Sequence, residues 1–305
     1  MPLTAYLEMI RVLFIAYHFP PVGGAGVQRS TKFVKLLPDF GVEPVVLAGP
    51  STGSGRWELE DGSLSRDIPD SVPIYRPEGP APEVAPLERR SRRLLSAQTR
   101  AASWWCSQIR DLGTRALSEH EVDLVFCTGA PFEGFVAALD LGREAGIPVV
   151  LDLRDPWALD EVQDYPSVVH RSLERNKMRS CLSRAAAVVM NTPEAQAVAR
   201  RAFAEMPVDK FHCIPNGYDP DDFASTWLPP SDDELTVVHA GSLHTDRGLS
   251  SRKLAALLGG RLKGVRHLPR SHWYLVRAME RLSEEKPEWN KRWRSVDMPP
   301  TRMCE

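Results

Sequence analysis

Cysteine is scarce in this sequence, and no two cysteines stand at the spacing of a metal site. No CxxC pair occurs, and no histidines stand at a matching distance from a cysteine. This excludes a zinc site built on cysteine pairs and argues against a disulfide framework, so we expect reduced, mostly buried thiols, as in a cytosolic protein. The five cysteines are Cys106, Cys127, Cys181, Cys213 and Cys304.

Long hydrophobic runs and an excess of charge of either sign are also missing. The apolar run at 12–17 is short, follows Glu8 and Arg11, and ends before Pro20 and Pro21. We therefore expect neither a signal peptide nor a transmembrane helix, and a cytoplasmic location. The formal net charge of -2 argues against a surface built as a whole for nucleic acid, so no nucleic-acid partner is predicted.

What the sequence does contain is a globular composition with room for two domains, since 43% of its 305 residues are hydrophobic and 26% are charged. Apolar runs of strand length alternate with segments of helical period. Strands that are apolar on both faces and separated by helices predict a doubly wound α/β domain with a parallel sheet, over residues 9–215. The expected strands are 11–17, 42–48, 122–129, 147–153 and 186–191.

Two segments of this domain do not follow that alternation. Residues 49–86 are rich in glycine, proline and serine, which predicts a surface excursion with one short strand near 72–77. Residues 86–117 predict one basic helix that carries leucines and tryptophans. Its part at 88–110 either lies on an anionic membrane surface or is a solvated basic face with Trp104 and Trp105 in the core.

The rest of the chain predicts a hinge and an incomplete second α/β unit. A new apolar run at 235–241 resembles the first strand of that unit. No acidic residue occurs from Arg247 to Met279, and the last residues have no periodicity. We assign 216–235 to the hinge and 236–305 to the incomplete unit.

The glycine-rich stretch after the first strand raises the question of which phosphate it binds. A dinucleotide loop needs a third glycine where Arg29 stands, and a carboxylate after the second strand that is missing here. The chain also has no GxxxxGK[ST] segment, which excludes a P-loop. Two readings remain: Gly23, Gly24 and Gly26 serve only a tight turn, or they bring backbone N–H groups and a helix start close to an anion.

Five stretches together resemble the successive landmarks of family 4 glycosyltransferases. The resemblance implies the GT-B fold, in which two Rossmann-like domains face each other across a cleft. It also implies a hexosyltransferase-type enzyme that retains configuration while moving a sugar from a nucleotide-sugar donor to a glycan or lipid-linked acceptor. No cofactor and no metal are expected besides that donor. The stretches are 12–47, 123–157, 185–203, 210–223 and 236–248.

The resemblance places Gly23, Gly24 and Gly26 near the donor phosphates and the acceptor. It gives Arg154 and Asp155 the catalytic position, because a guanidinium and a carboxylate suit the charges that develop on the diphosphate and the sugar. A structural Arg–Asp pair closing a strand is the alternative. The further residues that it assigns to substrate or donor binding in this half of the chain are Thr128, Gly129, Asp152, Asn216 and Gly217.

In the second half, the resemblance assigns donor binding to Gly241, Ser242 and Arg247. Ser242 stands where many relatives have an arginine, and no segment like ExxGxxxxE follows. The donor half is therefore expected to be truncated or divergent, and the alternative function is an inactive acceptor-side binding domain or a gene fragment. The acidic stretch at 219–222 offers a DxD match, but we expect it to cap the next helix.

Overall fold

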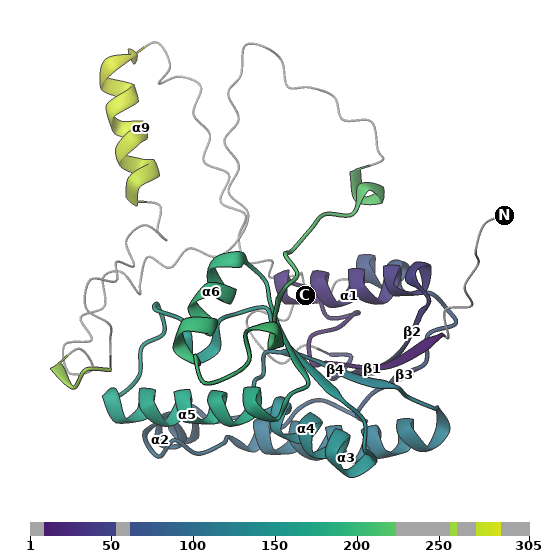
Figure 1. Ribbon diagram of the computed structural model, residues 1–305. Helices are drawn as coiled ribbons and strands as arrows, with labels where there is room; N and C mark the ends of the chain where they lie inside the picture. The colour runs from purple at the N-terminus through teal and green to yellow at the C-terminus, as the bar shows by residue number, and fades with distance from the viewer. Residues whose placement is uncertain (1–8, 53–61, 224–256, 261–272, 288–305) are drawn as a thin grey trace.

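One parallel sheet of seven strands is the centre of the protein (Figure 1). The computed structural model describes residues 9–52, 62–223, 257–260 and 273–287. The strand order is β3-β2-β1-β4-β5-β6-β7, and every neighbouring pair is parallel. The strands are β1 (Ile10–Ala16), β2 (Val42–Ala48), β3 (Ile74–Tyr75), β4 (Leu124–Gly129), β5 (Val149–Leu153), β6 (Ala187–Met190) and β7 (Phe211–Cys213).

Helices cover both faces of this sheet, with α1 on one face and α3, α4 and α5 on the other (Figure 1). The expected doubly wound, Rossmann-like α/β fold is therefore confirmed. The α-helices are α1 (Ala25–Leu36), α2 (Pro86–Leu94), α3 (Arg100–Glu119), α4 (Gly134–Ala145), α5 (Val168–Arg184), α6 (Pro193–Ala202) and α9 (Trp273–Glu285). Short 3-10 turns are η1 (Leu37–Phe40), η2 (Gly62–Asp67), η3 (Trp157–Leu159), η4 (Val208–Lys210) and η5 (Pro220–Phe223).

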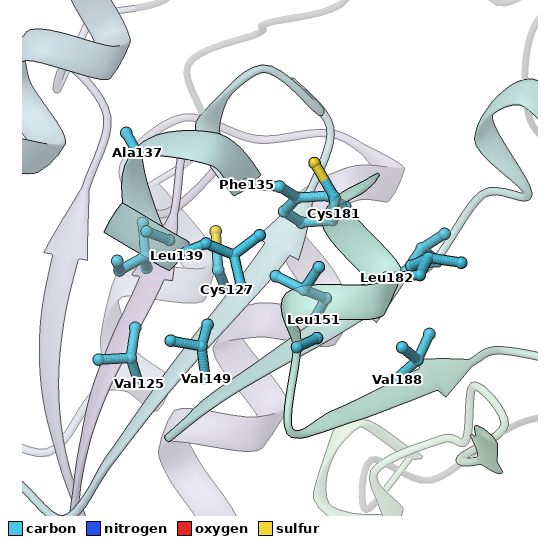
Figure 2. Close-up of a cluster of buried hydrophobic side chains, with 14 of the residues drawn as sticks. Val125, Cys127, Phe135, Ala137, Leu139, Val149, Leu151, Cys181, Leu182 and Val188 are labelled. Atoms are coloured by element: carbon cyan, nitrogen blue, oxygen red, sulfur yellow. The ribbon is translucent and has the colours of Figure 1, made fainter. Parts of the chain in front are cut away.

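The larger hydrophobic core lies between the sheet and α3, α4 and α5. Alternate residues of each strand point into it, such as Val125 and Cys127 of β4 and Leu151 of β5, and Phe135 of α4 packs on them (Figure 2). Burial raises the pKa of the Cys127 thiol far above its usual range. Among the described cysteines, three are buried and all are free thiols: Cys106, Cys127, Cys181 and Cys213.

The predicted basic helix at 86–117 is in fact two helices. The prediction of one helix was wrong because the chain turns between α2 and α3, where Ser96 has a φ of 51° and Thr99 caps α3 by accepting a hydrogen bond from the Ala102 amide. Trp105 on α3 is buried, whereas α2 contains no buried residue. Trp105 is thus in the core as one reading expected, and the membrane-surface reading of this segment stays a prediction.

The expected incomplete second unit lies almost entirely outside the described residues. The hinge is described only for 216–223, and the domain boundaries stay a prediction. No described helix is both long enough and apolar enough to cross a bilayer.

Candidate functional site

The carboxyl ends of the strands bring together most of the residues predicted for the first half of the site. In a parallel sheet all strands end at one edge, and ligands of doubly wound folds bind there. Thr128 and Gly129 end β4, while Asp152 lies in β5 and Arg154 directly follows it. Gly23 and Gly24 lie in the loop between β1 and α1, and Gly26 lies in the first turn of α1.

Asp152 is the centre of a buried hydrogen-bond network at this edge. Arg29 donates to both of its carboxylate oxygens, from Nη2 to Oδ1 at 2.8 Å and from Nε to Oδ2 at 3.1 Å. The hydroxyl of Thr128 donates to Oδ2 at 2.8 Å. Because a buried carboxylate needs a paired charge and filled hydrogen-bond positions, this arrangement accounts for an acidic residue inside a strand.

Arg29 extends the network to the end of the domain. Its Nη1 donates to Oδ1 of Asn216 at 3.0 Å, and its guanidinium lies 4.9 Å from the centre of the Phe33 ring. The Arg29 side chain is 8% exposed and the Asp152 side chain 0%. The contacts of Asp152 are thus with protein groups, and its predicted role in donor binding stays a prediction.

Arg154 lies against the first turn of α1. Its guanidinium donates to the carbonyl oxygens of Gly26 and Ala130, and the Asn191 amide donates to the Arg154 carbonyl. A Cβ on Gly26 would lie 2.9 Å from the Arg154 guanidinium, so a larger residue here would require that flexible side chain to shift. Burial lowers the pKa of Arg154, but an arginine remains charged at neutral pH.

Asp155 next to it is exposed. Arg154 and Asp155 form no ion pair in the described part of the chain, since the Arg154 guanidinium bonds to backbone carbonyls instead. The contacts therefore do not support the alternative reading of a structural Arg–Asp pair. The catalytic assignment of the two residues stays a prediction.

The glycine loop leads directly into α1. Gly24 is its N-cap, with φ 107° and ψ 166°, and its carbonyl accepts a hydrogen bond from the Val27 amide at 3.0 Å. The first turn of α1 contains no acidic residue and no side chain caps it. Unpaired N–H groups at a helix start favour an anion, and the Arg154 guanidinium lies beside this first turn.

The acidic stretch at 219–222 anchors the beginning of the hinge to α1. Lys32 Nζ donates to Asp219 at 2.7 Å and to Asp222 at 2.8 Å, and Lys35 Nζ donates to Asp219 at 2.7 Å. Lys32 also pairs with Asp67 at 2.6 Å. The two lysines hold the pKa of Asp219 well below its usual range, and these pairs raise the pKa of both lysines.

These contacts bear on the DxD match. The carboxylate oxygens of Asp67, Asp219 and Asp222 lie within 4.8 Å of one another, yet each of the three bonds to Lys32. An ammonium therefore holds the place that a cation would take. Asp219 Oδ1 accepts a hydrogen bond from the Asp221 amide at 3.1 Å at the start of η5, which confirms the predicted capping role.

The remaining predicted site residues either make few contacts or lie outside the described residues. Gly217 is exposed, and, its chain neighbours aside, no atom of the described residues lies within 4 Å of where its Cβ would be. Gly241, Ser242 and Arg247 lie outside the described residues, and their donor-binding role stays a prediction. Two residues of this site were not predicted from the sequence. Arg29 could have been found from its position in the glycine-rich stretch, whereas no sequence pattern points to Asn191.

Comparisons with known proteins identify the family of the chain. Residues 23–217 match the family model described as "Glycosyl transferase 4-like domain". That match contains every part of the edge described above: the glycine loop, Arg29, the β4 and β5 ends, and Asn216. A comparison with curated protein sequences finds no match.

Solved structures give weaker similarities, at the level of the fold. Anabaena HepE in complex with UDP and glucose is 16% identical with a TM-score of 0.38, covering 70% of this chain and 46% of that one. Sucrose-phosphate synthase of Thermosynechococcus elongatus is 10% identical with a TM-score of 0.45, covering 70% and 49%. Acinetobacter baumannii MurG is 16% identical with a TM-score of 0.36, covering 70% and 47%. The chain thus spans less than half the length of each.

Proposed function

Because the chain belongs to the family of glycosyl transferase 4-like domains, we propose that it is the acceptor-side half of a glycosyltransferase. The carboxyl edge of its sheet then forms one wall of the transfer cleft. The donor is a nucleotide sugar, the acceptor a glycan or a lipid-linked glycan, and the transfer of a hexose retains the configuration of the sugar. The resemblance of the five stretches supports these finer assignments.

The observation that carries the proposal is the position of Arg154 beside the start of α1. Its guanidinium is held by the Gly26 and Ala130 carbonyls, which leaves further N–H groups without an acceptor among the described residues. Together with the N–H groups at the start of α1, it offers a diphosphate several donors from a preorganised site. A leaving nucleoside diphosphate gains negative charge in the transition state, and such donors stabilise that charge.

Asp155 is suited to the opposite charge. A retaining transfer develops positive oxocarbenium character on the sugar, and a neighbouring carboxylate stabilises it. Asp155 is exposed at the end of β5, next to Arg154. In this proposal Arg154 binds the diphosphate and Asp155 faces the sugar, while Arg29 and Asp152 hold the underlying strand ends in place.

The test is nucleotide-sugar binding by the purified chain, measured by saturation-transfer NMR with UDP-glucose and GDP-mannose at millimolar concentration. We expect binding, and at least about tenfold weaker binding in Arg154→Gln, because a charge-assisted contact is worth about 1.5–3 kcal/mol. Arg143→Gln, a change on the exposed surface of α4, is the matched control. No binding of either nucleotide sugar, or equal loss in the control, would contradict the proposal.

The alternative is an acceptor-side binding domain without catalysis. It is favoured by Ser242, which stands where the resemblance expects an arginine. Release of free sugar from the bound donor, followed by chromatography, separates the two functions. Hydrolysis that is lost in Asp155→Asn supports the enzyme, whereas donor binding without hydrolysis or transfer supports the binding domain.

A further inference from the structure

Helix α2 exposes apolar side chains that the rest of the described protein does not cover. None of its residues is buried. Leu87 is 78% exposed, Leu94 57% and, just after the helix, Leu95 75%. Leu87 and Leu94 are seven residues apart and therefore lie on the same face, which Leu95 adjoins. Neighbouring exposed leucines of this kind mark an interaction surface when they belong to a larger patch.

Helix α5 extends this patch. His170 Nε2 lies 2.9 Å from the Leu94 carbonyl oxygen, and Lys177 Nζ donates to the Ser96 carbonyl at 3.2 Å. Leu173 lies between His170 and Lys177 on that face of α5, because residues three and four apart are neighbours on a helix. It is 45% exposed.

Val169 lies one turn before Leu173 and is also exposed. We call the whole patch the α2–α5 surface. Its apolar members are Leu87, Leu94, Leu95, Val169 and Leu173.

The same surface carries a concentration of positive charge. Four arginines of α2 are exposed, whereas its one acidic residue, Glu88, pairs with Arg100 of α3. In the described part of the chain, no ion pair neutralises Arg89, Arg90 or Arg92. A short helix with arginines beside leucines is complementary to a surface with phosphates outside and hydrocarbon beneath. The four arginines are Arg89, Arg90, Arg92 and Arg93.

The α2–α5 surface also lies toward the edge of the sheet that carries the candidate site. Helix α5 begins at Val168, after the loop that leaves the carboxyl end of β5 at Arg154. The C-terminal end of α2 contacts the first turn of α5 through His170. A flat partner bound to this surface would therefore be close to the loops that line the site.

We infer that the α2–α5 surface docks on an anionic lipid bilayer, with its leucines at the acyl boundary and its arginines at lipid phosphates. A nucleic acid would bind through the arginines alone and would leave the exposed leucines without a contact, whereas a bilayer contacts both. The inference does not rest on the proposed transferase activity. It assigns the contact to α2, which is the part of the predicted basic segment that has no buried residue.

The test is co-sedimentation of the full chain with vesicles of phosphatidylcholine alone, or of phosphatidylcholine mixed with phosphatidylglycerol, without any sugar donor. We expect binding to the anionic vesicles that decreases with added salt. Two variants should each weaken it at least about tenfold: the charge reversal Arg89→Glu with Arg90→Glu and Arg92→Glu, and the apolar change Leu94→Ser with Leu95→Ser. Both change only exposed side chains, and circular dichroism checks that they fold.

The matched controls are Arg143→Glu and Arg201→Glu for charge, and Val208→Ser for an exposed apolar residue elsewhere. These should leave vesicle binding unchanged. The inference is overturned if anionic and neutral vesicles bind alike, if either α2 variant binds as well as the original, or if the controls lose as much. Binding of duplex DNA that requires the same arginines, with no vesicle binding, would overturn it in favour of a polyanion site.

Discussion

At the scale of single residues, Arg29 joins three distant parts of the chain. Its guanidinium bonds to Asp152 in β5 and to Asn216 at the start of the hinge, and the Asp152 carboxylate also binds Thr128 of β4. All of the charge of Asp152 is balanced inside the protein. Arg29 is therefore a positioning residue for the strand ends on which Arg154 and Asp155 stand.

We predict that Arg29→Ala lowers the free energy of unfolding by about 3–5 kcal/mol, because it leaves a buried carboxylate without its cation. The measurement is urea denaturation followed by circular dichroism. Replacing both partners, in Arg29→Met with Asp152→Leu, should cost less than the single change, since no charge then remains unpaired.

The matched control for this prediction is Arg143→Ala. That arginine pairs with Glu144 on the surface, with both side chains 67% exposed, so its removal should cost no more than about 1 kcal/mol. An equal loss in the two single variants would show that the Arg29–Asp152 pair contributes no more than a surface contact.

At the scale of elements, the hinge is tied to α1 by charge. Lys32 and Lys35 both bond to Asp219, and Lys35 also pairs with Asp221 at 2.8 Å. These bonds hold 219–223 against the helix that begins at the glycine loop. The position of the chain as it leaves this domain is therefore coupled to the helix that carries Arg29.

We predict that this attachment depends on pH. The folded-state pKa of Asp219 is lowered, so its contribution is complete above its unfolded pKa of about 3.9 and is lost as the pH falls through the lowered value. The lysine pKa values are raised, so their contribution is complete below about 10.4 and is lost as the pH rises through the raised values. Amide hydrogen exchange at Asp222 measures the attachment.

Between these limits the protection of the Asp222 amide should be constant, and it should fall outside them. Asp219→Asn should weaken the protection at neutral pH and remove its acid dependence. Asp70→Asn changes an exposed carboxylate on another loop and should alter neither. Unchanged protection in Asp219→Asn would contradict a role for these ion pairs.

The division of 86–117 into α2 and α3 shows where sequence reasoning stops at this scale. Arginines and leucines stand on both sides of residues 96–99, and no glycine or proline there signals a break in the helix. The turn comes from Ser96 with a φ of 51° and from the Thr99 cap. Serine rarely adopts a positive φ, so the conformational preferences of the local sequence do not predict this turn.

At the scale of the molecule, residues 9–223 contain all seven strands of the described sheet and the described helices that cover its two faces. We predict that a chain ending at Phe223 still unfolds cooperatively in a thermal scan followed by circular dichroism. Among the described residues it loses the backbone bonds from Val168 to Leu258 and from Tyr165 to Gly260, and the bond from the Arg171 guanidinium to the Gly260 carbonyl, at about 0.5–1.5 kcal/mol each. A broad transition without cooperativity would show that the fold needs later residues.

The parallel sheet could be predicted because its strands are apolar on both faces and alternate with helices, which is a local property of the sequence. The members of the site could be placed only at strand ends. Their pairing could not be predicted, since Arg29 meets a residue 123 positions away and another 187 positions away. Such contacts depend on the order of the strands in the sheet and on which side chains are long enough to meet. A local sequence pattern predicts neither.

Gly49 follows β2, and its amide donates to the Ala16 carbonyl at 3.2 Å. A Cβ at this position would lie 2.2 Å from the carbonyl oxygen of Tyr17, a backbone atom that cannot swing aside. Position 49 should therefore be among the least variable in any set of relatives that keeps this turn. An invariant glycine so close to the glycine loop would suggest ligand binding in an alignment, although the reason is only that two backbones touch.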